Sequence, residues 1–346
     1  MTRGIWKAWS GRTLRCGSAV LALLAGIAVA SPVLAQEVEL KLITGFPFDG
    51  PGGDRMYGPK QFIERFNQRA KGKARIRLIG GPEVVAPFDQ LKALQTGQFD
   101  MMVTSSLFFT DLKSMHFINY ITSAEQVRGM PKGRELLQRV TQEQASVAFV
   151  GLATPGFPFY IWSRQSKPLS TVADAKGLKL RGLPGVNEHL VRSLGMVPTN
   201  VPSNEVYSAL RSGIIDAAIR DVVSVDLLNE GEFARTRTEA RVCDCSSEIY
   251  IANPSWNKLS AEVKQLLNDI AGEVERDAFP WLEKRAAQSA QALEKKYGAT
   301  MTKGSPDLND TLGRKIPGAM IRDNIKDSKV RDQLISVFEL APYLKD

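Results

Sequence analysis

The sequence predicts an α/β protein of two related lobes, with mixed or parallel sheets flanked by helices, and three observations carry this prediction. Strand and helix patterns alternate along the first part of the chain. The pattern A-L-x-x-G-x-x-D occurs at residues 93–100 and again at 209–216, each time where a helix pattern gives way to a strand pattern. Apolar residues recur at helical spacing from Ser260 to Gly298, a stretch long enough to span both lobes.

The first lobe is predicted from three strand patterns, two alternating and one wholly apolar. They lie at residues 38–43, 74–79 and 99–104. Between the first two, apolar residues recur at helical spacing and Gly72 is expected to cap the helix. Asp89 is expected to cap a short helix that ends at Gly97. This order of strands and helices predicts a parallel sheet.

The second lobe places an arginine at the end of a strand. The strand pattern at 178–181 ends in Arg181, just before a loop with two glycines and a proline. A helix pattern, an extended segment with two prolines and a helix closed by Gly213 follow. In open α/β sheets, ligands bind at the carboxyl ends of strands, and arginine suits a carboxylate or phosphate there. We therefore expect Arg181 to hold a small anion.

The last part of the chain is predicted to be helical. Pro280 interrupts the helix pattern of residues 260–298, so we expect a kink near Phe279. A short strand at 299–302 and a last helix after Asp310 follow. We expect lobe I to comprise residues 36–157 and 249–275, and lobe II residues 158–248 and 276–346.

The N-terminus has the pattern of a secretory signal peptide. Four basic residues precede an apolar run at 19–30, and residues 33–35 form a small-residue cleavage site. We expect cleavage near Ala35, export to the periplasm and no stable membrane insertion of the mature chain, because that run is too short to span a bilayer. The net charge of +8 falls to about +4 without the four basic residues. No basic run is interleaved with aromatic residues, so nucleic acid is not an expected partner.

The sequence offers little for catalysis. His116 and His189 lie far apart, and no hydrolase elbow, zinc-protease motif or nucleotide-binding loop occurs. Cys243 and Cys245 are interpreted as two thiols on one face of a strand, since a bridge across one residue is strained. We therefore expect no enzyme activity, no metal and no cofactor.

Three linked motifs resemble the periplasmic solute receptors of TRAP transporters, the DctP-like family. They are D-A-K-G-L-K-L-R at 174–181, L-G-M-V-P-T-N-V-P at 194–202 and E-V-Y-S-A-L-R-S-G-I-I-D at 205–216. Further similarity lies at 97–106 and at N-P-S-W-N-K-L-S, residues 253–260. The resemblance implies a two-lobed periplasmic binding protein fold with a long helix spanning both lobes. It also implies that the lobes close over a small organic acid and that the loaded protein delivers it to a membrane permease.

The resemblance implies that Arg181 pairs with the ligand carboxylate. Two positions depart from the family. Arg220 stands where many members have asparagine, and Ser203 stands where an aromatic residue is frequent. Arg220 binds a second carboxylate or is neutralised by Asp221, and the sequence does not choose. Arg164, at the end of the preceding strand, is a candidate second cation.

Further candidates follow other strands and motifs. Phe46 follows the first strand, Phe88 lies beside a glycine-proline turn, and Ser105 follows the third strand. Phe159 lies near the crossing between the lobes, and Tyr207 belongs to the third motif. Aromatic residues of this kind pack on a ligand's carbon skeleton or belong to the core.

Three alternatives remain at this point. A receptor for an ABC transporter shares the two-lobed architecture, and a long helix across both lobes favours the TRAP assignment over it. An exported hydrolase or lyase requires His116 or His189 within hydrogen-bond reach of a carboxylate or hydroxyl in the cleft. A sensory ligand-binding subunit is a third alternative.

Overall fold

The computed structural model describes residues 37–49, 56–109, 111–120, 124–164, 168–183 and 186–345. By their contacts, residues 36–346 form one compact unit, and the described residues begin at Glu37. The predicted signal peptide therefore lies outside the described residues. In the described part of the chain, no helix is long and apolar enough to cross a membrane.

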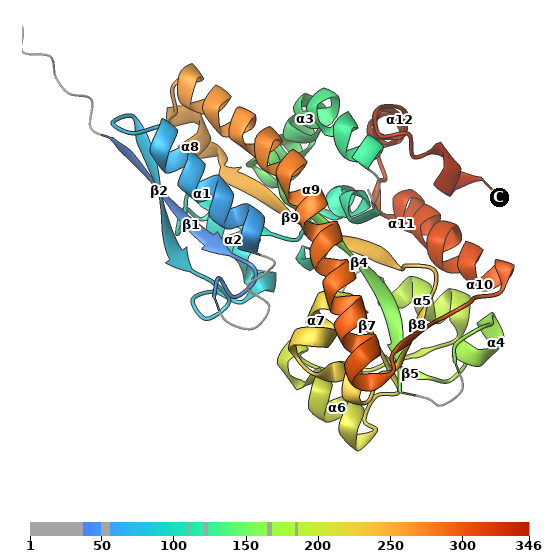
Figure 1. Ribbon diagram of the computed structural model, residues 1–346. Coiled ribbons are helices and arrows are strands. Elements are labelled where there is room, and N and C mark those ends of the chain that lie inside the picture. Colours follow the sequence, from blue (N-terminus) through green and yellow to red (C-terminus); the bar gives the residue numbers. More distant parts are fainter. Residues whose placement is uncertain are drawn as a thin grey trace, which may run out of the picture. The chain divides into compact units, whose positions relative to one another are not determined.

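The strands and helices of the described residues alternate much as the sequence predicts (Figure 1). The strands are β1 (Val38–Thr44), β2 (Ala74–Gly80), β3 (Met101–Thr104), β4 (Val147–Ser163), β5 (Lys179–Arg181), β6 (Val197–Pro198), β7 (Ala217–Asp221), β8 (Thr236–Thr238), β9 (Cys243–Ala252) and β10 (Thr300–Thr302). The α-helices are α1 (Tyr57–Arg69), α2 (Gln90–Gln95), α3 (Ala124–Ala145), α4 (Val172–Ala175), α5 (Asn187–Leu194), α6 (Val206–Ser212), α7 (Val222–Leu227), α8 (Asn253–Lys258), α9 (Ala261–Tyr297), α10 (Pro306–Asp310), α11 (Ile316–Asn324) and α12 (Ser328–Val337).

The sheet is mixed, with a parallel part in each lobe. Its strand order is β2-β1-β3-β9-β4-β7-β5-β6, and β8 pairs with β4 and β10. In lobe I, β1 is parallel to β2 and β3; in lobe II, β5 is parallel to β6 and β7. The parallel sheet predicted for lobe I is confirmed. Between the two parallel parts, β9 and β4 run antiparallel to their neighbours.

β4 and β9 carry the chain between the two parallel parts of the sheet. Their register shifts three times, the last time between Thr154 and Phe157. Gly156 lies in this irregular stretch with φ +121, a left-handed conformation that favours glycine. A side chain there would also meet Cβ of Asp244 at 3.0 Å. Two of the predicted lobe boundaries, 157/158 and 248/249, fall within these two strands, and the third, 275/276, falls within the helix Ala261–Tyr297. The assignment of residues to lobes stays a prediction.

The repeated A-L-x-x-G-x-x-D pattern builds the same junction twice. Gly97 and Gly213 have φ +77 and +76 and follow α2 and α6. After each glycine, an aspartate accepts a hydrogen bond from a backbone N–H of the adjacent parallel strand. Oδ2 of Asp100 lies 2.9 Å from N of Lys41, and Oδ2 of Asp216 lies 3.0 Å from N of Lys179. The aspartate therefore ties the start of one strand to its neighbour in both lobes.

One predicted cap differs from the structure. Asp89 occupies the N-cap position of α2, but its side chain makes no capping hydrogen bond. Its φ and ψ of −100° and −9° continue a preceding 3-10 turn instead of the extended backbone that a capping side chain needs. The interpretation of Asp89 as a capping side chain is therefore wrong.

The 37-residue helix α9 spans both lobes (Figure 1). Oγ of Ser260 caps its start and Gly298 ends it in a left-handed conformation. In lobe I, Arg69 of α1 pairs with Glu273 at 2.7 Å. In lobe II, Oγ of Ser289 lies 2.8 Å from Oδ2 of Asp226 of α7. Pro280 lies inside the helix, and the kink expected there stays a prediction.

Candidate ligand-binding site

Arg181 lies at the carboxyl end of β5, as the sequence predicts. Its parallel partner in β7 is Ala218, so the carboxyl ends of β5 and β7 share one edge of the sheet. The side chain is half-buried, and its Nε donates to the carbonyl of Val201 at 3.3 Å. Arg181 is also among the charges that act on the nearby carboxyl group of Glu230. This places one guanidinium group at the edge where ligands of α/β sheets bind.

Arg220, near the end of β7, is held in a buried ion pair. Its Nε donates to Oε1 and Oε2 of Glu230 at 3.1 and 2.9 Å, and its Nη2 also contacts Oε1. Nη1 of Arg220 donates to Oγ of Ser203 at 2.8 Å, and Nη2 of Arg220 donates to the backbone carbonyl of Ser203 at 2.9 Å. The Arg220 and Glu230 side chains are only 6% and 1% exposed. We call Arg181, Ser203, Arg220 and Glu230 the arginine cluster.

The sequence left open whether Arg220 binds a second carboxylate of the ligand or is neutralised by Asp221, and in the structure Arg220 pairs with Glu230. Burial raises the pKa of the Glu230 carboxyl, and the Arg220 guanidinium opposes this effect. The Asp221 carboxylate accepts from N and Oγ of Ser224 at 2.9 and 2.6 Å and caps α7. Within the cluster, Glu230 compensates the charge of Arg220, and each of the three guanidinium nitrogens donates to Glu230 or Ser203.

Arg164 follows β4 and lies beside the start of β7, whereas Arg181 lies at the carboxyl end of the neighbouring strand β5. Because β4 is antiparallel to β7, its last residue, Ser163, pairs with Ala217 at the start of β7. The backbone N of Arg164 donates to the carbonyl of Asp216 at 3.0 Å, and the side chain is exposed. The structure does not bring Arg164 to the edge that holds Arg181.

In lobe I, the predicted aromatic residues meet around a phenylalanine that the sequence analysis did not single out. The Phe46 and Phe88 rings lie 5.7 and 5.4 Å from the Phe108 ring. Phe108 ends the 3-10 helix η3 (Ser106–Phe108), directly after β3. The Phe88 side chain is 59% exposed, so this aromatic group presents apolar surface to solvent.

Ser105 belongs to a buried polar network beside these rings. Its Oγ donates to Oδ1 of Asn119 at 3.1 Å, and Sγ of Cys245 lies 3.5 Å away. Glu248 of β9 accepts from the backbone N of Ser106 at 2.5 Å. Burial raises the pKa of Glu248 to about 8. The hydroxyl of Ser105 is thus engaged by the protein, and the network fixes the turn after β3.

Two further candidates make contacts within lobe II. Phe159 of β4 is 4% exposed and belongs to the hydrophobic core of lobe II. In the sheet it lies opposite Asp221 of β7 and Cys243 of β9. The Tyr207 hydroxyl donates to Oε2 of Glu232 at 2.8 Å, and its ring lies edge-on to Phe233. That hydrogen bond raises the pKa of Tyr207. Neither residue has a described contact with the arginine cluster.

Neither histidine has the surroundings of a catalytic base. Nε2 of His116 lies 3.0 Å from the carbonyl of Phe109, and burial lowers the pKa of His116 to about 4. Nδ1 of His189 lies 3.8 Å from Oδ2 of Asp323, too far for a hydrogen bond. Cys243 and Cys245 are buried on one face of β9 and form no disulfide within the described chain. No group of three metal-binding side chains occurs among the described residues.

The fold agrees with comparisons to known proteins. The family model of the bacterial extracellular solute-binding proteins, family 7 (DctP), matches residues 56–311, and the chain belongs to this family. It is a solute-binding protein of the kind that serves TRAP transporters. Members of this family receive small organic acids and deliver them to a TRAP permease.

Individual relatives are distant but match most of the chain. A solute-binding protein of Albidiferax ferrireducens is 25% identical over 294 residues, covering 81% of this chain and 83% of its own. The C4-dicarboxylate-binding periplasmic protein DctP of Rhodobacter capsulatus is 25% identical over 270 residues, covering 74% and 78%.

Solved structures show the same fold. A TRAP transporter solute-binding protein of Bordetella bronchiseptica with bound calcium and picolinate matches at a TM-score of 0.73 and 18% identity, covering 89% of this chain and 92% of its own. A Bordetella pertussis receptor that binds pyroglutamic acid matches at 0.69 and 19%, covering 87% and 99%.

Proposed function

We propose that this protein is a periplasmic receptor for a small organic acid with one carboxylate, which it binds through Arg181 and delivers to a TRAP permease. The observation that carries the restriction to one carboxylate is the Arg220–Glu230 pair. Arg220 is the second cation of the cluster, but Glu230 compensates its charge and Ser203 takes two of its donors. A second ligand carboxylate in this cluster would face Glu230 without a free counter-charge.

Arg181 alone does not account for useful affinity. One charged hydrogen-bonded contact contributes about 1.5–3 kcal/mol, whereas micromolar binding needs about 8 kcal/mol. The aromatic group of exposed Phe88 and half-buried Phe46 and Phe108 supplies a second contribution, since burying apolar surface gains about 25 cal/mol per Å². We therefore propose that the ligand's carbon skeleton packs on these rings when the lobes close.

The irregular stretch of β4 and β9 supports closure at this place. A register shift and Gly156 with positive φ interrupt the regular ladder between the two parallel parts of the sheet. Local changes of φ and ψ at such positions are the usual basis of hinge motion. We propose export by the N-terminal signal, with cleavage near Ala35, as the step that precedes ligand binding.

Relatives indicate which acids to test. The Bordetella structures contain picolinate or bind pyroglutamic acid, and a Bradyrhizobium receptor binds galacturonate, whereas the Rhodobacter relative is named for C4-dicarboxylates. A ligand present at 100 times its dissociation constant stabilises the folded state by about 2.7 kcal/mol. We expect the three monocarboxylates to include a stabilising ligand and succinate to stabilise less, as measured by thermal unfolding of the purified protein.

Two outcomes would contradict this function. Preferential stabilisation by succinate would contradict the restriction to one carboxylate. Chemical conversion of the bound acid, detected by mass spectrometry, would show that the protein is an enzyme instead of a receptor. The neutral amide of the best acid serves as the matched control and is expected to bind at least about tenfold more weakly, equivalent to about 1.4 kcal/mol.

A further inference from the structure

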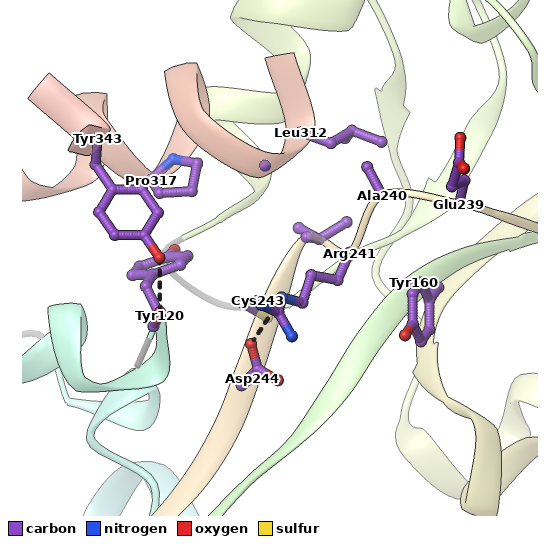
Figure 2. Close-up of a pocket in the computed structure, with 12 residues that line it drawn as sticks. Tyr120, Tyr160, Glu239, Ala240, Arg241, Cys243, Asp244, Leu312, Pro317 and Tyr343 are labelled. Atoms are coloured by element: carbon purple, nitrogen blue, oxygen red, sulfur yellow. Dashed lines mark hydrogen bonds and ion pairs between the residues drawn. The ribbon is translucent and has the colours of Figure 1, made fainter. Parts of the chain in front are cut away.

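A cavity lies apart from the arginine cluster. Its volume is about 310 Å³, within the range of small-molecule sites. It lies among β4, β9, the 3-10 segment Lys113–Tyr120 and the C-terminal helices, and neither Arg181 nor Arg220 lines it. We call it the tyrosine cavity, after Tyr120, Tyr160 and Tyr343 (Figure 2).

A buried carboxylate lines the tyrosine cavity. Asp244 of β9 is 3% exposed, and its Oδ2 makes no hydrogen bond to any described residue. Its nearest cation is Arg241, with Nε at 3.5 Å, and the Arg241 side chain is 42% exposed. That contact joins Arg241 to the same Oδ2 and is an ion pair, not a hydrogen bond. Burial raises the pKa of Asp244 to about 7. A buried carboxylate oxygen that accepts no hydrogen bond is costly, so Asp244 has capacity for a further partner.

Aromatic rings flank this carboxylate. Figure 2 shows Tyr120 and Tyr343 on one side of Asp244 and Arg241, and Tyr160 on the other. The hydroxyl of Tyr343 donates to the carbonyl of Tyr120 at 3.3 Å, and the hydroxyl of Tyr120 contacts Sδ of Met320. These two hydroxyls are thus engaged by the protein. The Tyr160 ring already contacts the guanidinium of Arg237 at 4.1 Å. The other aromatic rings of the lining are Tyr343, which is half-buried, and Tyr120, which is 2% exposed.

We infer that the tyrosine cavity binds a small organic ammonium ion, with its charge on Asp244 and its apolar body against Tyr120 and Tyr343. A carboxylate combined with aromatic rings recognises cations through an ion pair and through the ring faces. Glu239, which also lines the cavity, adds a second negative charge, and its carboxylate accepts from the backbone N of Gly304 and from Nδ2 of Asn309. A bound ammonium ion takes the place of Arg241, whose exposed side chain can turn to solvent.

The test uses benzylammonium as the probe and benzyl alcohol as its neutral counterpart. Calorimetric titration of the purified protein is expected to show saturable binding of benzylammonium, at least about tenfold tighter than that of benzyl alcohol. Asp244→Asn should weaken benzylammonium by about tenfold or more, while Asp269→Asn, a change of an acid on α9 outside the cavity lining, leaves it unchanged. Equal binding of the two probes, no saturation at millimolar concentrations, or full affinity in Asp244→Asn would overturn the inference.

A second variant decides the question if Asp244→Asn does not fold. Arg241→Gln removes the competing cation from the rim and is expected to tighten benzylammonium binding severalfold. Unchanged or weaker binding in Arg241→Gln would overturn the inference. Both titrations test the tyrosine cavity independently of the proposed organic-acid site. They contain no carboxylate ligand, and no residue of the arginine cluster lines the tyrosine cavity.

Discussion

Replacing Glu230 by glutamine tests the arginine cluster through stability. Glutamine keeps the size of the side chain but removes the charge that faces Arg220 at 2.9–3.1 Å. The two bonds to Ser203 remain, yet the guanidinium is left uncompensated with its side chain only 6% exposed. Removing one partner of a buried pair costs about 3–5 kcal/mol, and we expect a loss of this size in the free energy of unfolding.

The assay is urea unfolding of the purified protein and of three variants at pH 7. Glu230→Gln and Arg220→Met are each expected to lose several kcal/mol. The double variant Arg220→Met/Glu230→Met should recover most of that loss, because an apolar pair leaves no buried charge unpaired. The same Glu230→Gln change uncovers Arg220, so we expect dicarboxylates to gain affinity relative to monocarboxylates.

A small effect would refute this reasoning. If Glu230→Gln and Arg220→Met each change stability by less than about 1 kcal/mol, the pair behaves as an exposed ion pair does. Arg220 would then be available to a ligand, and the restriction to one carboxylate would have no structural basis.

Two further predictions concern other buried or paired carboxyl groups. Asp100→Ala and Asp216→Ala each remove a charged acceptor from a backbone N–H, and we expect each to lower the free energy of unfolding in urea by about 1.5–3 kcal/mol. The control variant Asp89→Ala removes no capping bond and should change the free energy of unfolding little. Equal effects at all three positions would contradict the role of the repeat. Burial raises the pKa of Glu248 from 4.5 to about 8, so the folded state binds the extra proton between these values and this contribution to stability falls as the pH rises through that window. Glu248→Gln should therefore reduce the decline of stability between pH 6.5 and 8 by up to about 1.4 kcal/mol per pH unit, and parallel curves for the two proteins would contradict it.

The sequence predicted the parts of the fold that follow from local periodicity. Strands β1, β2 and β5 lie within about two residues of their predicted bounds, because their apolar residues alternate. The A-L-x-x-G-x-x-D repeat also identified equivalent junctions in the two lobes. Its aspartates bond to neighbouring strands, a role that no local pattern specifies.

The rest of the site depends on contacts between distant segments. Glu230 lies ten residues after Arg220, and α7 separates the two in sequence. The strand that precedes Arg181 in the sequence predicts Arg164 as a second cation, but the antiparallel direction of β4 places Arg164 beside the start of β7, away from the edge that holds Arg181. Asp244 and Tyr343 line one cavity although they lie far apart in the sequence, so no spacing in the sequence indicates the tyrosine cavity.

The affinity of the Arg181→Lys variant for the best monocarboxylate tests the central claim most directly. Lysine keeps the charge but loses the planar pair of donors, and Arg164→Lys makes the same change at the opposite end of the strands. By calorimetry, we expect Arg181→Lys to bind about 10- to 100-fold more weakly, equivalent to about 1.4–2.8 kcal/mol, and Arg164→Lys to bind as the unmodified protein does. Unchanged affinity in Arg181→Lys, or an equal loss in Arg164→Lys, would contradict the assignment of Arg181 as the carboxylate-binding residue.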